Sequence, residues 1–174
     1  MSDNLSRRRY LAGTGAALTI GTLAGCSGGG DGGDGGDGSD GSDGSGGGNA
    51  AEDVPDEIDE YLSDARMYEG TIMDFTGQDE VTVEVGAGDV GFAFSPAAIR
   101  IDSSTTVVWE WTGNGGAHNV ASVEGSESDF NSGDAVSEEG ATFEQSFDNT
   151  GIQLYQCTPH QANGMLGAIE VVEA

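Results

Sequence analysis

A cysteine, a histidine and a methionine lie close together near the end of this 174-residue chain, at Cys157, His160 and Met165. The spacing Cys-x2-His-x4-Met places a soft thiolate, an imidazole and a thioether within nine residues. These ligands are typical of a copper site with two histidines, one cysteine and a weak, long bond to methionine, which needs one further imidazole. The only other histidine is His118. The pattern therefore predicts a copper site built from these four residues.

The predicted ligands come from two distant parts of the chain, which the fold has to bring together. His118 lies in the glycine-rich loop 113–120, directly after the strand-like segment 105–111, and Cys157 follows a second apolar segment. Small residues before His118 and after His160 allow both loops to close around a metal. The alternative is a buried cysteine with a purely structural role, as is common for free cysteine. That alternative leaves the other three predicted ligands unexplained.

Short alternating apolar segments fill the chain from Tyr68 onward. They include the alternations at 81–85, 92–94, 99–101, 107–111, 143–147, 152–154 and 169–171. Turn-rich pieces such as 86–89 and 102–104 separate them. Many short strands with such breaks indicate an all-β, antiparallel sandwich or barrel. The roughly 107 residues from 68 to 174 are enough for one core of this type.

The first 26 residues predict an export signal. Three arginines at 7–9 precede the apolar, Gly/Ala-rich stretch 11–25, as in a twin-arginine signal. The stretch is short for a transmembrane helix, which needs about 20 apolar residues. It ends at Leu23-Ala24-Gly25-Cys26, which resembles a bacterial lipobox and implies a lipidated Cys26 as the first mature residue. The alternatives are an uncleaved anchor and an ordinary signal.

A flexible acidic tether is expected at 27–53, followed by a possible short helix at 54–67. Gly-Gly-Asp and Gly-Ser-Asp repeats form a solvated coil that its own charges extend. In the helical segment Pro55 suits the first position, and apolar residues recur at helical spacing, at Val54, Ile58, Leu62 and Ala65. This helix either packs on the domain or extends the tether.

Acidic residues far outnumber basic ones, with 31 Asp and Glu against 5 Lys and Arg and a net charge of −26. After removal of the signal, only Arg66 and Arg100 remain as cations. Such a surface excludes binding of nucleic acid or anionic lipid by charge. The acids suit either a basic docking partner or solubility in concentrated salt. Because the Debye length is about 3 Å at 1 M salt, and acids occur in tether and domain alike, we favour halophilic solvation. The acidic segment 124–140 is expected to be a solvated loop.

Several motifs resemble those of the plastocyanin-type cupredoxins, and of their membrane-attached halocyanin branch in particular. The motifs are Phe94-Ser95-Pro96, Val107-Val108-Trp109, His118-Asn119-Val120, and Tyr155-Gln156-Cys157-Thr158-Pro159-His160 running to Gly164-Met165. The resemblance covers roughly residues 70–174. It implies a cupredoxin Greek-key β-sandwich and one copper ion that cycles between Cu(I) and Cu(II).

The same resemblance assigns roles to individual residues. It implies that His118, Cys157 and His160 form a trigonal copper site, with Met165 as the long axial ligand. Asn119 would link the two ligand loops by hydrogen bonds near the cysteine, and Thr158 and Pro159 would support the ligands. The sequence departs from the family pattern at Gln153 and Gln156, where aromatic residues are usual, whereas Tyr155 keeps the core role expected on the side of Cys157.

The predicted function is that of a lipid-tethered blue (type 1) copper protein, acting as a monomer that carries one electron between membrane-bound redox partners on the outer face of the cell membrane. His160 is expected to reach the surface among small and apolar neighbours that include Leu166. Four protein ligands leave no open position for a substrate, so we expect a carrier and not an enzyme. The alternatives are an extracytoplasmic copper storage or delivery protein, with labile copper, and an adhesion or sensor module isolated without copper.

Overall fold

The computed structural model describes residues 47–174. The expected export signal, Cys26 and most of the expected tether lie outside these residues. Within the described part of the chain, no helix combines the length and apolar character needed to cross a bilayer.

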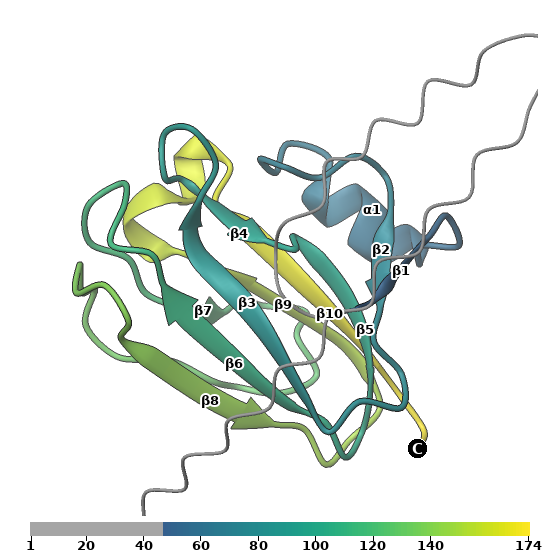
Figure 1. Ribbon diagram of the computed structural model, residues 1–174. Helices are drawn as coiled ribbons and strands as arrows, with labels where there is room; N and C mark the ends of the chain where they lie inside the picture. The colour runs from purple at the N-terminus through teal and green to yellow at the C-terminus, as the bar shows by residue number, and fades with distance from the viewer. Residues whose placement is uncertain (1–46) are drawn as a thin grey trace, which may run out of the picture. The chain divides into compact units, whose positions relative to one another are not determined.

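Two β-sheets face each other across a single core in residues 47–174 (Figure 1), which confirms the predicted all-β sandwich. The larger sheet has, in spatial order, β1 (Asn49–Ala51), β2 (Ile72–Asp74), β5 (Ala98–Asp102), β10 (Leu166–Val172), β9 (Gly151–Gln156) and β7 (Ala121–Ser122). The smaller sheet has β4 (Ala93–Ser95), β3 (Glu80–Ala87), β6 (Thr106–Trp111) and β8 (Thr142–Ser146). Helix α1 (Asp56–Leu62) and the 3-10 turn η1 (Thr158–Asn163) complete the described elements.

Strand direction differs from the expectation of an antiparallel fold. β5 runs parallel to both of its neighbours, β2 and β10, and β3 runs parallel to β6. The remaining strand pairs are antiparallel. Alternating apolar residues determine which face of a strand is buried, but they carry no information about the direction of its neighbour. The antiparallel expectation was therefore wrong for these three pairs.

The core lies between the inner faces of the two sheets. Val81, Val83 and Val85 of β3 point inward at alternate positions, as the period of two predicts. Trp109 of β6 is fully buried and makes an edge contact with Tyr155 of β9, with 5.4 Å between ring centroids. This pair joins the two sheets directly beneath the end at which β6 and β9 finish.

Helix α1 packs on the outer face of the larger sheet, against β9 and β10. Its apolar residues Ile58 and Leu62 are fully buried with Leu154 and Ala168 of these strands. The helix occupies Asp56–Leu62 of the segment 54–67, and Pro55 is its N-cap residue instead of its first helical residue. The segment therefore covers the domain and does not simply prolong the tether.

The chain enters the fold at the outer edge of the larger sheet. Asn49–Ala51, which the sequence placed at the end of the tether, form β1 and pair antiparallel with β2. Tertiary pairing thus gives this Asn-Ala-Ala stretch, which follows a run of glycines, a strand conformation that its composition does not favour. Asn49 lies opposite Asp74, which is level with Arg100 of β5 and Glu170 of β10.

Arg100 fastens this edge to the rest of the sheet. Its Nε donates to Glu170 Oε2 at 2.6 Å, and its Nη2 donates to the Asp53 carbonyl at 2.9 Å. Asp74 Oδ2 lies 3.7 Å from Nη1. The Arg100 side chain is 14% exposed and that of Glu170 is 22% exposed, so their contact is screened less by salt than an exposed ion pair is.

Candidate metal centre

The predicted ligands meet at one end of the sandwich. His118 lies in the connection between β6 and β7, and Cys157 directly follows β9 as the N-cap residue of η1. His160 lies within η1, and Gly164 ends this turn in the left-handed region at φ 82°. Only a residue without Cβ adopts this conformation without strain. The turn at Gly164 ends η1 and is followed directly by Met165.

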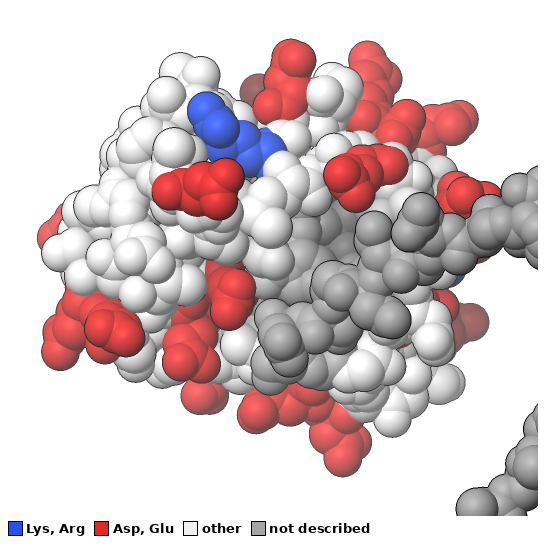
Figure 2. Space-filling view, turned by 45° about the horizontal axis from the view of Figure 1, so that its top comes forward, with Lys and Arg blue, Asp and Glu red and all other residues white. Residues whose placement is uncertain are grey.

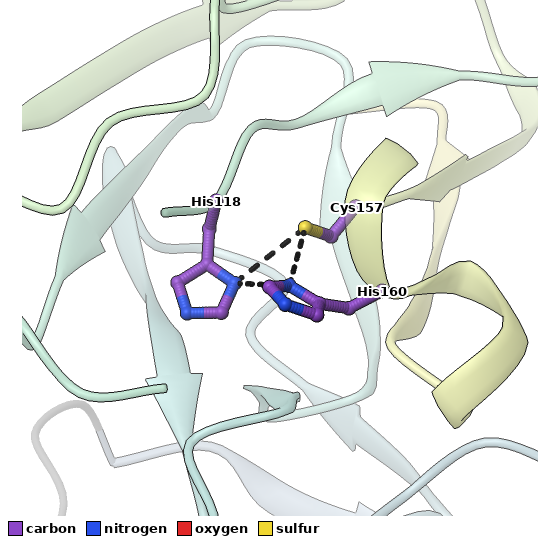
Figure 3. Close-up of side chains that lie close together, drawn as sticks. All are labelled: His118, Cys157 and His160. Atoms are coloured by element: carbon purple, nitrogen blue, oxygen red, sulfur yellow. Dashed lines mark hydrogen bonds between the residues drawn. The ribbon is translucent and has the colours of Figure 1, made fainter. Parts of the chain in front are cut away.

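The sulfur and two ring nitrogens form a small triangle (Figure 3). Cys157 Sγ lies 3.5 Å from His118 Nδ1 and 3.5 Å from His160 Nδ1, and the two nitrogens are 3.1 Å apart. A triangle with these sides has a centre about 2.0 Å from all three atoms, which is a metal–nitrogen bond length in proteins. The three side chains thus leave a space at their centre that fits one metal ion.

The ring of His118 is oriented for metal binding. Its Nε2 lies 2.8 Å from the carbonyl oxygen of Asn114. A carbonyl only accepts hydrogen bonds, so Nε2 carries the proton, and Nδ1 presents a free lone pair to the centre of the triangle. A histidine that donates its remote N–H to a carbonyl is the usual arrangement of a metal ligand.

Burial keeps the two innermost groups uncharged before a metal binds. His118 is 1% exposed and Cys157 is 0% exposed. Burial lowers the pKa of His118; the Asn114 carbonyl opposes this shift, and the nearby His160 ring adds to it. Burial raises the pKa of the Cys157 thiol, and backbone N–H groups of Asn119 and His160 partly offset that rise. A cation at the centre supplies the charge that a thiolate needs in this buried place.

Met165 is fully buried in the same core cluster as Cys157. The Cys157 N–H donates to the Met165 carbonyl at 3.1 Å, and the Met165 N–H donates to the His160 carbonyl at 3.3 Å. These two bonds fold the ligand loop on itself and hold Met165 beside Cys157. A thiolate, two imidazoles and a nearby thioether are the donor set of a copper site with a long axial ligand.

Asn119 joins the two loops that carry the ligands. Its Oδ1 accepts the Thr158 N–H at 2.8 Å, and its Nδ2 donates to Thr158 Oγ1 at 3.2 Å. Pro159 occupies the first turn of η1, where its missing N–H costs no hydrogen bond. The His118 backbone is held from its other side by paired hydrogen bonds with Val136 and by the indole N–H of Trp111.

Phe92, which the sequence assigned to the alternating apolar segment 92–94, contacts both histidines. Its ring stacks on His160 with 4.3 Å between centroids and an interplanar angle of 20°, and its edge faces His118 at 6.4 Å. Gly91 and Gly115 touch backbone to backbone, and this contact leaves no space for a Cβ on either residue. The alternation at 92–94 predicted a strand that includes Phe92, but β4 begins at Ala93, and nothing in the sequence indicated the contact with the histidines.

Residues 80–172 match the sequence profile of the copper binding proteins of the plastocyanin/azurin family. This chain belongs to that family. It is 58% identical to halocyanin from Natronomonas pharaonis over 171 residues, which cover 97% of this chain and 98% of that protein. It is 33% identical to plastocyanin from Scenedesmus fuscus over 99 residues, or 53% of this chain and 99% of the relative. The oxidised plastocyanin structure from Dryopteris crassirhizoma aligns with 53% of this chain and 100% of its own, at 25% identity and a TM-score of 0.45.

The sequence matches thus confirm the plastocyanin/azurin family, the resemblance to halocyanin and copper as the cofactor, and the chain is a blue copper cupredoxin, an electron carrier by its family. The site at His118, Cys157, His160 and Met165 fits that copper through its donor set and its geometry.

Two details of this cupredoxin differ from the sequence-based expectation. The acidic segment 124–140 exposes its carboxylates, yet it is more than a solvated loop, because Phe130 is buried in the core and Val136 pairs with His118. Leu166 packs into the cluster beneath α1 and belongs to the outer face of the larger sheet. The apolar residue found against His160 is instead Phe92.

The two glutamines of β9 differ in burial. Gln153 is fully buried, and its Oε1 accepts hydrogen bonds from Ser126 Oγ and the Ser128 N–H. Gln156 is partly exposed at the end of the strand. Tyr155 between them has the predicted core position, fully buried against Phe94 and Trp109.

Proposed function

We propose that this cupredoxin is a lipid-anchored carrier that passes single electrons between membrane-bound redox partners on the outer face of the cell membrane. The observation that carries the electron-transfer part of this proposal is the unequal burial of the ligands. His118 and Cys157 are closed off from solvent, whereas His160 is partly exposed. One exposed ring edge suits electron exchange with a docked protein, while the buried ligands exclude water and small molecules.

The protein holds its ligand loops in one arrangement. Copper in the site would alternate between Cu(I) and Cu(II) and thereby store one electron. Hydrogen bonds that do not involve the ligand atoms fix the loops, namely those of Asn119 with Thr158 and of Val136 with the His118 backbone. Because these bonds are independent of the oxidation state, the side chains need little rearrangement when an electron arrives or leaves.

We place the docking surface around His160. Phe92 covers one face of its ring, and Val90, in the same loop as Phe92, is 52% exposed. Val90 is one of three large hydrophobic residues that are exposed in residues 47–174. An apolar surface beside an electron exit docks a partner by desolvation, which concentrated salt strengthens.

The spectrum of the copper-loaded protein tests the electron-carrier role. A carrier shows an intense thiolate-to-copper absorption band and retains copper in both oxidation states, whereas a storage or delivery protein is weakly coloured and releases copper readily. Cys157→Ser should abolish the band because it removes the thiolate, and Cys26→Ser should leave it intact. A Cys157→Ser protein with an unchanged band would contradict the assignment.

The attachment is supported by sequence motifs alone. The arginines at 7–9, the apolar stretch 11–25 and the lipobox-like Leu23-Ala24-Gly25-Cys26 are arranged as in an exported lipoprotein. Cys26→Ser should release the protein into the medium, and Cys157→Ser should remain with the membrane fraction. Retention of Cys26→Ser in the membrane would show that residues 11–25 stay in place as an uncleaved anchor.

A further inference from the structure

The segment that follows α1 lies directly against the loop between His160 and Met165. The Arg66 N–H donates to the Gly164 carbonyl at 2.8 Å, and Arg66 Nε donates to the Asn163 carbonyl at 2.7 Å. The approach is close, because a Cβ on Gly164 would lie 2.6 Å from the Asp64 carbonyl oxygen. Arg66 thus satisfies two consecutive carbonyls at the end of η1, where a helical turn leaves its last carbonyls without internal partners.

The same segment is fixed on either side of Arg66. Before it, Tyr61 of α1 donates its hydroxyl to the carbonyl of Tyr155, two residues ahead of Cys157. After it, Met67 has φ 62° and is the one non-glycine residue with positive φ in residues 47–174. A non-glycine residue keeps such a conformation only where its surroundings hold it. The segment therefore contacts the end of β9 ahead of Cys157 and the turn between His160 and Met165.

Residues 61–67 precede the range 80–172 that matches the plastocyanin/azurin profile. The contact with the ligand loop is accordingly made by a part of this chain that the shared cupredoxin sequence does not include. Arg66 is also exposed, so its side chain is not part of the hydrophobic core, and its hydrogen bonds to Asn163 and Gly164 are not a by-product of core packing.

We propose that Arg66 is a positioning residue of the copper site. Its two hydrogen bonds hold the turn between His160 and Met165 in the ligating arrangement whether or not a metal is present. This inference rests on the copper site described above. A hydrogen bond of this kind is worth about 1 kcal/mol, so loss of the Nε contact should increase the rate of copper release from the site by roughly fivefold.

Two uncharged substitutions separate the hydrogen bond from the charge. In Arg66→Gln the side-chain nitrogen is the same number of bonds from Cα as Arg Nε, so it can still donate to the Asn163 carbonyl. Arg66→Met has a side chain of similar length without a donor. Both variants lose the positive charge equally. We expect copper(II) to pass to excess EDTA roughly five times faster from Arg66→Met than from the unaltered protein, with a broader EPR signal, and Arg66→Gln to behave like the unaltered protein.

Amide hydrogen exchange in the metal-free protein provides a second measurement. The residue-66 amide should exchange faster in Arg66→Met than in Arg66→Gln, because the turn at 163–164 is held less tightly. The free energy of unfolding of the two metal-free variants should differ by no more than about 1 kcal/mol, the contribution of the one hydrogen bond that Arg66→Met lacks. Equal behaviour of the two variants in chelation and exchange would overturn the proposal, and so would a loss of stability in Arg66→Met larger than that one hydrogen bond accounts for. Absence of a blue band from the unaltered protein would refute the proposed function and leave the exchange comparison standing.

Discussion

Individual atoms at the metal centre decide its chemistry. The hydrogen bond from His118 Nε2 to the Asn114 carbonyl fixes the tautomer, and the hydrogen bonds between Asn119 and Thr158 fix the distance between the two ligand loops. The ligand types were predictable, because Cys157, His160 and Met165 are neighbours in the sequence. The contact of Phe92 with His160 was not, since it depends on two loops that meet only in the folded chain.

Replacement of the axial candidate should retain the colour and change the potential. In Met165→Gln the thiolate of Cys157 remains, so the blue absorption band should persist, and a harder oxygen donor should lower the reduction potential by stabilising Cu(II). Absorption spectroscopy with redox titration measures both. Met67→Gln is the matched control, because Met67 is an exposed methionine outside the ligand set. An unchanged or raised potential in Met165→Gln would show that Met165 does not act as the axial donor.

At the scale of elements, α1 and β1 turn an acidic entry segment into part of the domain. The helix was partly predictable from the spacing of Ile58 and Leu62, and its docking depends on the apolar outer face that β9 and β10 present. β1 was not predictable, because a three-residue strand of Asn and Ala forms only through its pairing with β2. The three parallel strand pairs were not predictable either, because the relative direction of two strands depends on how the chain crosses between the two sheets.

Truncation of a buried residue in α1 tests whether the helix is integral to the fold. Leu62→Ala removes a fully buried side chain that packs against the larger sheet. We expect a loss of about 2–5 kcal/mol in the free energy of unfolding, measured with denaturant. Glu57→Ala, on the exposed side of the same helix, should change it by less than about 0.5 kcal/mol. A similarly small effect of Leu62→Ala would mean that the helix is not integral to the folded domain.

The Asp74 carboxylate at the end of β2 gives this edge of the sheet a dependence on pH. Its pKa is lowered, chiefly by the hydrogen bond from the Thr76 N–H and further by Arg100. A lowered pKa in the folded state means that the stabilisation is complete above the unfolded value of 3.8 and is lost as pH falls through the folded pKa. Asp74→Asn should be less stable near pH 7 and should lose less stability on acidification. Denaturation midpoints between pH 7 and pH 2.5 measure this, and parallel curves for the two proteins would contradict it.

Across the whole molecule, acidic groups dominate the surface. Figure 2 shows acidic side chains all around the visible outline, with very few basic atoms among them. In residues 47–174 the only Lys or Arg residues are Arg66 and Arg100, and both donate hydrogen bonds to other residues of the domain. Composition was sufficient to predict this surface. It could not show that Arg66 lies beside the metal centre, because that position depends on how the segment after α1 folds back.

Docking through the apolar surface should persist at salt concentrations that abolish electrostatic steering. Val90→Glu places a charge beside Phe92, so it should slow electron transfer to the native partner at molar salt without altering the copper spectrum. Replacing Glu138 and Glu139 by Gln should have the smaller effect there, because the Debye length is about 3 Å at 1 M salt. Stopped-flow transfer at low and high salt gives the comparison. A larger effect of the Glu138 and Glu139 substitutions at molar salt would make docking electrostatic.

The register of β1 also sets a direction for a molecule held by its N-terminus. Asn49 lies level with Glu170, four residues along β10 from Leu166, where the ligand loop ends. At about 3.3 Å per residue, the chain enters the sheet roughly 13 Å away from the redox end, measured along the strands. Any pull through the N-terminus would therefore act first on β1 and the Arg100 contacts. If the proposed lipid anchor holds the N-terminus, the point of attachment and the proposed site of electron exchange at His160 would therefore lie toward opposite ends of the larger sheet.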